Sequence, residues 1–253
     1  MGVTVRHPDL AVEWLGYATA RIEGPGGTVV YTDPGRYGCL TGQWSADSEA
    51  AVEAHPPARD YRAGDGDLIV VTHDHHYDSD GIRRVAADDA TVVVYDAVYP
   101  EGIDRDVEPL SALPYDVVRV DDETDALLAD VVVRTVAAYN LPDGPNLTAD
   151  GEPIHPEGFG CGYLLTLGGT TVFWPGDSDV LPGHEALDVD VFLPPIGNFT
   201  MDRHDAAALA GALDPELVVP IHYNTFGALE ADSGAFAVDV AKRGIPVALD
   251  ERD

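Results

Sequence analysis

Basic residues are scarce in this sequence. Its 253 residues contain 14 lysines and arginines against 45 aspartates and glutamates, a formal net charge of −31, and Lys242 is the only lysine. Nucleic acids and anionic membranes bind proteins through basic patches, so neither is an expected partner. Salt screens such self-repulsion, and we therefore expect adaptation to a salty cytoplasm. An acidic, soluble protein without such adaptation is the alternative.

Cysteines and long apolar runs are also scarce. Cys39 and Cys161 are the only cysteines, which excludes a disulfide framework and a metal site built on paired cysteines. No stretch approaches the ~20 apolar residues of a membrane span, and the N-terminus lacks the apolar core of a signal peptide. We find no repeat or linker. We therefore expect one cytoplasmic domain over residues 1–253, and a homo-oligomer is possible.

Short apolar runs rich in β-branched residues recur along the chain and predict a mixed α/β fold. Strands at 68–72 and 91–95, joined by a helix near 81–87, are expected to be parallel. Gly168-Gly169 centres a predicted hairpin over 161–174. Residues 36–66 predict a long loop with a helix near 47–54. The other predicted elements are strands at 10–15, 18–22, 28–32, 117–120, 126–128, 131–136, 189–193, 217–221 and 247–249, and helices at 201–213, capped by Asp202, and 234–242.

The end of the strand at 68–72 carries the densest group of metal-binding side chains. Three histidines and three aspartates lie within residues 73–80. His73 and His75 are one residue apart, so both rings can reach one point in a tightly turning backbone. Neutral imidazoles and carboxylates that converge in this way favour a divalent cation, zinc before others.

Three further metal-type residues follow other predicted strands: His155, Asp177 and His222. One buried histidine alone is more often a hydrogen-bonded core residue than a ligand. Several at strand exits favour a shared metal centre. The histidines without this context, which we expect to face solvent, are His7, His55, His184 and His204.

Asp33 also ends a predicted strand, where it precedes Pro34 and Gly35. We expect it to form a turn, and support of the metal site is the alternative.

Several short motifs, in this order, resemble the metallo-β-lactamase superfamily, and in particular its ascorbate-phosphate-lactonase-like branch of predicted zinc-dependent hydrolases. Each motif is weak alone, whereas their order and spacing are specific and span roughly residues 11–225. The motifs are Trp14-Leu15-Gly16, Thr32-Asp33-Pro34, Thr72-His73-Asp74-His75, Ala138-Tyr139-Asn140, His155-Pro156-Glu157-Gly158, Gly162-Tyr163, Gly176-Asp177-Ser178-Asp179, Leu193-Pro194 with Thr200-Met201-Asp202, and Pro220-Ile221-His222-Tyr223.

The resemblance implies a four-layer αββα sandwich with the metal site at one edge. It also implies roles for the candidate residues. His73, His75 and His155 would hold a first metal, Asp177 would bridge to a second, and His222 would ligate the second.

The histidine row departs from the family pattern, His-x-His-x-Asp-His. Read without a gap, Tyr77 replaces the aspartate and Asp78 the last histidine. Read with His76 as an insertion, Asp78 matches the aspartate and Ser79 replaces the histidine, which is the reading we favour. Asp78 is a ligand candidate in both readings, and His76 could supply the missing nitrogen. One or two zinc ions are expected, with Mn²⁺ possible in an oxygen-rich second site.

These residues predict a metal-dependent hydrolase in which a metal-bound hydroxide attacks a small ester, lactone or phosphodiester. Asp78 or Asp177 would orient the hydroxide and move its proton. A member that binds metal or ligand without turnover is the alternative, and a nuclease is disfavoured by the acidic surface. Ser178 is expected to be a turn hydroxyl. Candidate substrate contacts are Tyr139, Asn140, Asn198, Tyr223 and Asn224, with packing as the alternative for the tyrosines.

Overall fold

The computed structural model describes residues 4–35, 64–103, 105–225 and 227–251. The predicted helix near 47–54 and most of the loop 36–66 lie outside the described residues, as do Cys39 and His55. Cys161 is buried.

The first sheet has seven strands in the order of the chain, β1 to β7. Strands β1 to β4 are antiparallel, and β4 to β7 are parallel. The predicted hairpin between residues 18 and 32 and the parallel pair at 68–72 and 91–95 are therefore confirmed. The strands are β1 (Val5–Arg6), β2 (Ala11–Gly16), β3 (Thr19–Glu23), β4 (Val29–Thr32), β5 (Gly66–Val71), β6 (Ala86–Tyr95) and β7 (Asp116–Val120).

The second sheet has six strands in the order β13-β12-β11-β10-β9-β8. Strands β8 to β11 are antiparallel, whereas β11 to β13 are parallel. The hairpin about Gly168 is present, and the last predicted strand is reduced to one bridge between Val218 and Val247. The strands are β8 (Asp125–Leu128), β9 (Val131–Ala138), β10 (Gly160–Leu167), β11 (Thr170–Trp174), β12 (Val191–Phe192) and β13 (Leu217–Val218).

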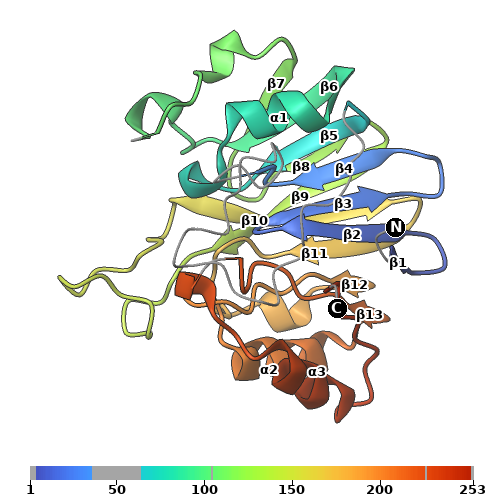
Figure 1. Cartoon of the computed structure of the whole chain (residues 1–253), viewed down its shortest axis with the longest axis vertical. Coiled ribbons are helices and arrows are strands. Elements are labelled where there is room, and N and C mark those ends of the chain that lie inside the picture. The colour runs from blue at the N-terminus through green and yellow to red at the C-terminus, as the bar shows by residue number, and fades with distance from the viewer. Residues whose placement is uncertain (1–3, 36–63, 104, 226, 252–253) are drawn as a thin grey trace.

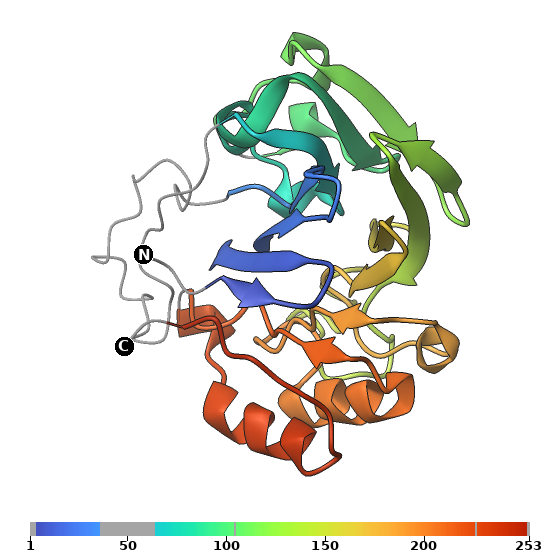
Figure 2. The same ribbon diagram turned by 90° about the vertical axis from the view of Figure 1, so that its right-hand side faces the viewer.

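The described α-helices accompany the parallel parts of the two sheets. Figure 1 shows α1 (Ser79–Val85) beside β5 to β7 at the top, and α2 (Arg203–Leu213) next to α3 (Ser233–Ala241) below β12 and β13. Figure 2 shows the same arrangement from the side. Asp202 caps α2 as predicted, because its carboxylate accepts hydrogen bonds from the backbone of His204 and Asp205. The architecture agrees with the predicted αββα sandwich.

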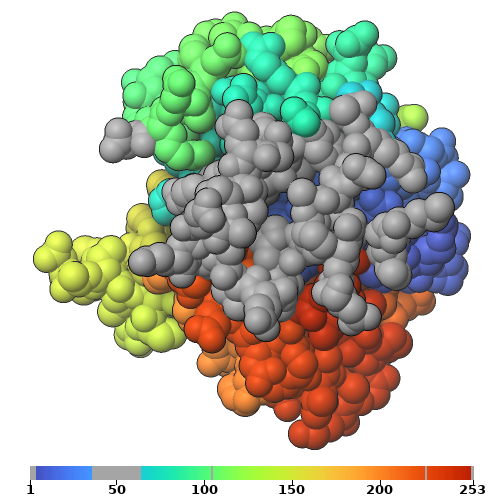
Figure 3. Space-filling view, viewed as in Figure 1, coloured from blue at the N-terminus to red at the C-terminus, as the bar shows by residue number. Residues whose placement is uncertain are grey.

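Apolar side chains fill the space between the sheets. The apolar residues of β5 are fully buried, as are the large rings of Trp14 and Trp174. In Figure 3, the segment after β9, coloured yellow-green, projects from the body of the molecule. The part of the chain that the structure describes contains no helix with the length and apolarity that a membrane crossing requires.

Hydrogen bonds between the sheets join the end of β4 to the end of β11, and the end of β5 to β10. Trp174 donates from its indole Nε1 to Asp33 Oδ2 over 2.7 Å, and Tyr163 donates from its hydroxyl to Val71 O over 3.0 Å. The absence of a side chain at Gly160 permits this closeness, since a Cβ there would lie 2.8 Å from His73 Cβ. These contacts bring the strand exits of both sheets to one place.

Two of the histidines that were expected to face solvent are buried. His184 is 2% exposed, and its Nε2 contacts Ala137 O at 2.9 Å. His7 is 9% exposed and pairs with Glu216. The prediction was wrong for both, because each has a polar partner distant in the sequence. His204 is exposed, as predicted.

Candidate metal centre

Three histidines form what we call the first ligand group. His73 and His75 follow β5, and His155 comes from the loop between β9 and β10. One ligand nitrogen from each lies within 4.8 Å of the others. His75 Nδ1 and His155 Nε2 are 3.1 Å apart. The structure therefore brings together the three residues that the resemblance assigned to one metal.

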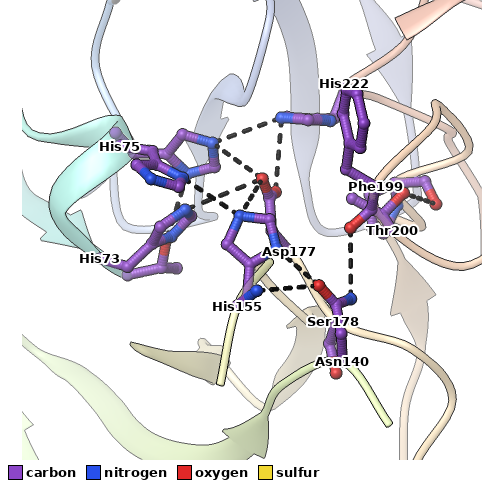
Figure 4. Close-up of polar contacts among 12 residues, drawn as sticks. His73, His75, Asn140, His155, Asp177, Ser178, Phe199, Thr200 and His222 are labelled. Carbon is purple, nitrogen blue, oxygen red and sulfur yellow. Dashed lines mark hydrogen bonds and ion pairs between the residues drawn. The ribbon is translucent and has the colours of Figure 1, made fainter. Parts of the chain in front are cut away.

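Asp177, His76 and His222 form what we call the second ligand group. Asp177 Oδ1 lies 3.3 Å from His222 Nε2, and its Oδ2 lies 3.5 Å from His76 Nε2. The same Oδ2 is 3.7 Å from His73 Nε2 and 3.6 Å from His155 Nε2. Figure 4 shows the labelled histidines turned toward this carboxylate. Asp177 thus lies between the two groups, as a bridging ligand would.

The spacing of these atoms fits metal coordination. Imidazole nitrogens at about 2.0–2.1 Å from a tetrahedral zinc ion are roughly 3.3 Å apart. The nitrogens of His76 and His222 are 3.3 Å apart, and those of His75 and His155 are 3.1 Å apart. Five of the six side chains are at most 5% exposed, and only His75 is half-buried. A buried set of nitrogen and carboxylate donors at this spacing fits a divalent cation.

One hydroxyl, that of Thr72, sets the orientation of two of these histidines. Thr72 Oγ1 donates to Asp33 Oδ2 at 3.0 Å, so its oxygen is left to accept. It lies 2.8 Å from His73 Nδ1 and 3.1 Å from His76 Nδ1. Both Nδ1 atoms must then carry a hydrogen, which leaves the lone pair on Nε2 in each ring. Each Nε2 faces Asp177 and can bind a metal.

Asp33 supports the site and is not merely the predicted turn residue. It is 1% exposed and accepts hydrogen bonds from Thr72 and from Trp174. Its Oδ2 lies 3.0 Å from His76 Nδ1. Burial raises the pKa of Asp33 to about 7, against the lowering effect of the hydrogen bonds from Thr72 and Trp174. A carboxylate behind a metal-binding imidazole fixes the ring and increases its basicity.

Asn140 supports His155 in the same way with a neutral group. Its Oδ1 accepts from both the backbone N and the Nδ1 of His155, each at 3.0 Å. Its Nδ2 donates to Asp179 Oδ1 and to Phe199 O, each at 3.2 Å. Because both partners of Nδ2 are acceptors, the amide orientation is determined, and His155 presents its Nε2 lone pair to the cluster.

His155 is held in the neutral form that metal binding requires. Burial, together with the nearby rings of His75 and His222, lowers its pKa to about 3. A neutral ring does not repel an incoming cation and has a free lone pair.

The backbone around the site contains residues in the left-handed region. Asp33 has φ 38°, Tyr17 has φ 51° and His222 has φ 58°. His222 N donates to Tyr17 O at 2.9 Å, which ties two of these residues together. Non-glycine residues in this conformation cost energy and collect at functional sites, so their occurrence here agrees with a site that is held for chemistry.

The structure does not bring Asp78 into either ligand group. Its Oδ1 accepts from Gly81 N at 2.9 Å as the N-cap of α1. Tyr77, which replaces the aspartate in the ungapped reading, donates its hydroxyl to Glu108 O and is buried away from the cluster. The turn Asp74–His76 instead presents His76. The role predicted for Asp78 is therefore corrected to helix capping, and His76 takes its place as ligand candidate.

The expected substrate contacts also need correction. Tyr223 is fully buried and stacks on Trp14 with ring centroids 4.5 Å apart, so the packing alternative applies. The Asn224 amide is bonded to the backbone of Ala231, and the Asn140 amide serves His155. These three side chains pack against or form hydrogen bonds with other residues of the protein, so they are not available for substrate contacts.

Two expected contacts remain outside the core. Tyr139 is half-buried, and its backbone bonds to Ser178 Oγ and to Asp179 N. Ser178 is a turn hydroxyl, as predicted. Asn198 is exposed and lines a surface cavity of about 350 Å³, which none of the candidate ligands lines.

Phe159 was missed by the sequence reasoning. Its half-buried ring packs against His73, His75 and His155, with centroids 5.5, 5.1 and 6.0 Å away. It forms an apolar wall beside the first ligand group. Its place directly after the His155 motif is the only sequence signal that could have indicated it.

Comparison with known proteins agrees with this geometry. A family profile described as a β-lactamase superfamily domain matches residues 11–222. The chain belongs to this superfamily, and the resemblance found in the sequence is confirmed.

Several relatives are named "UPF0173 metal-dependent hydrolase". The one from Thermococcus kodakarensis is 31% identical over 235 residues, and the one from Pyrococcus horikoshii is 32% identical over 235 residues. Each alignment covers 89% of this chain and 89% of the relative. One from Carboxydothermus hydrogenoformans is 39% identical over 89 residues, only 33% of this chain and 39% of that protein.

Solved structures with low sequence identity show the same fold. A candidate metal-dependent hydrolase from Parabacteroides distasonis has a TM-score of 0.69 at 20% identity, with 98% of this chain and 97% of that chain covered. The metallo hydrolase Igni18 from Ignicoccus hospitalis has a TM-score of 0.64 at 21% identity, with 95% and 94% covered.

Proposed function

We propose that this protein is a metal-dependent hydrolase of a small ester, lactone or phosphodiester. The observation that carries the proposal is the convergence of two ligand groups on the carboxylate of Asp177, which lies 3.3–3.7 Å from four imidazole nitrogens. The names of the relatives support hydrolysis as the reaction class. Zinc is the proposed metal because the ligands are mainly imidazoles, with Mn²⁺ as a further possibility.

The ligand sets assign different tasks to the residues. His73, His75 and His155 are neutral donors, so they would leave a first ion with its full charge. Asp177 would bridge the ions, and His76 and His222 would complete the second position. Metal ions at such a site lower the pKa of water to about 7 and polarise a substrate oxygen. Asp177 would also accept the proton that the water gives up.

The altered histidine row had favoured a binding protein without turnover. His76 supplies a nitrogen near Asp177 and His222, which supports a second metal position and so favours the enzyme. We propose that the whole chain, 1–253, acts as one such domain in the cytoplasm. The net charge of −31 argues against a nucleic-acid substrate.

The test is metal content and turnover in matched histidine and aspartate variants. His73→Ala and Asp177→Ala should lose bound metal and all turnover on a panel of lactones, phosphodiesters and esters at high salt. His204→Ala replaces an exposed histidine and should keep both. Removal of metal with a chelator should abolish turnover, and added Zn²⁺ should restore it. Full turnover by the metal-free protein would contradict the proposal.

A further inference from the structure

One guanidinium nitrogen, Nη2 of Arg105, contacts several backbone carbonyls in and directly after the turn Asp74–His76. Arg105 Nη2 donates to Tyr77 O at 2.9 Å and to Asp74 O at 3.0 Å, and lies 3.4 Å from His75 O. Asp74 O also accepts from Tyr77 N at 3.2 Å, whereas the last carbonyls of a helical turn lack a partner within it. A single cationic donor therefore satisfies the end of the turn that carries His75 and His76, and charge-assisted hydrogen bonds of this kind are the stronger ones.

The segment around Arg105 holds the outer side of the same turn at further points. Asp74 Oδ1 accepts from Tyr99 N at 2.7 Å. The Tyr77 hydroxyl donates to Glu108 O at 2.7 Å, and Ser79 Oγ accepts from Glu108 N at 3.0 Å. Arg105 is itself fixed by tight turns on both sides, since its N donates to Ile103 O and its O accepts from Val107 N.

The inner side of the turn carries the chemistry. His76 points away from this segment, with Nδ1 at 3.0 Å from Asp33 Oδ2 and Nε2 at 3.3 Å from His222 Nε2. His76 and Tyr77 are neighbours, so the rotation of the turn decides which of them faces Asp177. The contacts of Arg105 to the carbonyls of residues 74, 75 and 77 hold the rotation in which His76 does so.

We propose that Arg105 is a positioning residue that presents His76 to the second metal position, and that this contact lets the altered histidine row hold a second ion. The inference rests on the proposed metal centre. His76 would supply the ligand nitrogen that the usual row supplies locally, and Arg105, about thirty positions away in the sequence, would hold it in place.

A matched control lies in the same part of the fold. Arg119 donates from Nη1 to Asp96 O at 2.8 Å and from Nη2 to Val98 O at 3.2 Å. It therefore also holds backbone carbonyls of a loop, but it makes none of these contacts to the turn Asp74–His76. Arg119→Gln removes the same charge and similar hydrogen bonds as Arg105→Gln, but none of the hydrogen bonds to the carbonyls of residues 74 and 77.

The experiment is a stepwise titration of the metal-free protein with Zn²⁺ by calorimetry, repeated with Co²⁺ and read by its visible absorption. The wild type should bind two ions in two steps. Arg105→Gln should weaken the second step about 10–100-fold, the range typical for residues behind metal ligands. The first step should change by less than about threefold, and the Co²⁺ spectrum of the second step should lose its wild-type shape. Arg105→Lys should restore part of the affinity, because an ammonium group keeps the positive charge and offers hydrogen-bond donors.

The outcomes separate this inference from the proposed function. A wild type that binds no metal would contradict both. Two wild-type steps together with an unchanged second step in Arg105→Gln would overturn the role of Arg105 alone. Equal weakening in Arg119→Gln, or equal weakening of both steps in Arg105→Gln, would also overturn it, since either result shows a general effect on the fold or its charge.

Discussion

His155 and His76 contribute to neighbouring ligand groups, but the groups behind the two rings differ. The Nδ1 of His155 contacts a neutral amide oxygen, that of Asn140, at 3.0 Å. The Nδ1 of His76 contacts a carboxylate, that of Asp33, at 3.0 Å, and also the hydroxyl of Thr72. A carboxylate increases the basicity of a ligand imidazole more than an amide does. We therefore expect the proposed second position to depend more on a charged support than the first.

Removal of the charged support should have the largest effect. In Asp33→Ala, His76 loses the carboxylate, and the donors Thr72 N and Trp174 Nε1 lose their buried acceptor. We expect the second metal step to weaken about 100-fold and the free energy of unfolding to fall by about 1–3 kcal/mol. Metal titration and denaturant unfolding measure the two effects. If Asp33→Ala weakened the first metal step as much as the second, Asp33 would not support the second position selectively.

Removal of the amide of Asn140, the neutral support, should weaken metal binding less, and at the first ligand group. Asn140→Ala frees the ring of His155 to rotate, and we expect the first metal step to weaken about tenfold. Titration with Zn²⁺ measures this change. Asn198→Ala, which shortens an exposed asparagine, should leave both steps as in the wild type. If Asn140→Ala weakened the second metal step as much as the first, Asn140 and Asp33 would not support separate ligand groups.

Thr72 contacts a histidine of each ligand group, His73 and His76, so its variants should weaken metal binding modestly at both groups. Thr72→Val removes the hydroxyl that fixes Nδ1 of His73 and of His76. We expect both metal steps to weaken about fivefold, from the loss of roughly 1 kcal/mol in hydrogen bonding per step. Thr72→Ser keeps the hydroxyl and should bind metal as the wild type does. Metal titration of the three proteins checks the order, and equal behaviour of the valine and serine variants would argue against the hydroxyl.

The stability of the metal-free protein should depend on pH, with opposite signs for His155 and Asp33. The pKa of His155 is lowered from 6.5 to about 3 on folding, so its contribution to stability is present above pH 6.5 and lost as the pH falls. The pKa of Asp33 is raised from 3.8 to about 7, so its contribution is present below pH 3.8 and lost as the pH rises.

Between these limits the two contributions oppose each other. Stability measured by denaturant unfolding of Asp33→Asn should therefore rise with pH more steeply than that of the wild type between about pH 4 and 6.5, by up to about 1.4 kcal/mol per pH unit. A shallower rise in the variant would show that the sign assigned to Asp33 is wrong.

The sequence predicts the centre of the site better than its surroundings. His73, His75, His155, Asp177 and His222 each follow a strand whose pattern is visible in the sequence, and parallel strands place their exits at one edge. The choice between Asp78 and His76 is different. It depends on the rotation of one short turn, which is held by Arg105 and by segment 99–108. No local pattern in residues 73–79 contains that information.

The polar side chains around the ligands were misassigned for a related reason. Tyr223 and Asn224 closely follow His222 in the sequence, and Asn140 belongs to the motif that precedes His155, which made them candidates for substrate contacts. Each is buried, and each finds a partner only when the chain is folded. His184 and His7 show the same limit, because burial of a polar side chain depends on distant partners that a sequence motif does not reveal.

The six candidate ligands divide equally between the two sheets. His73, His75 and His76 follow β5 of the first sheet, whereas His155, Asp177 and His222 follow strands of the second. An ion bound by both sets is then a cross-link through the open edge of the sandwich. Separation of the sheets at this edge would release the metal, so the ion would stabilise the fold as well as take part in the reaction. In a chain with a charge of −31, it would also bring positive charge to the place where the two halves meet.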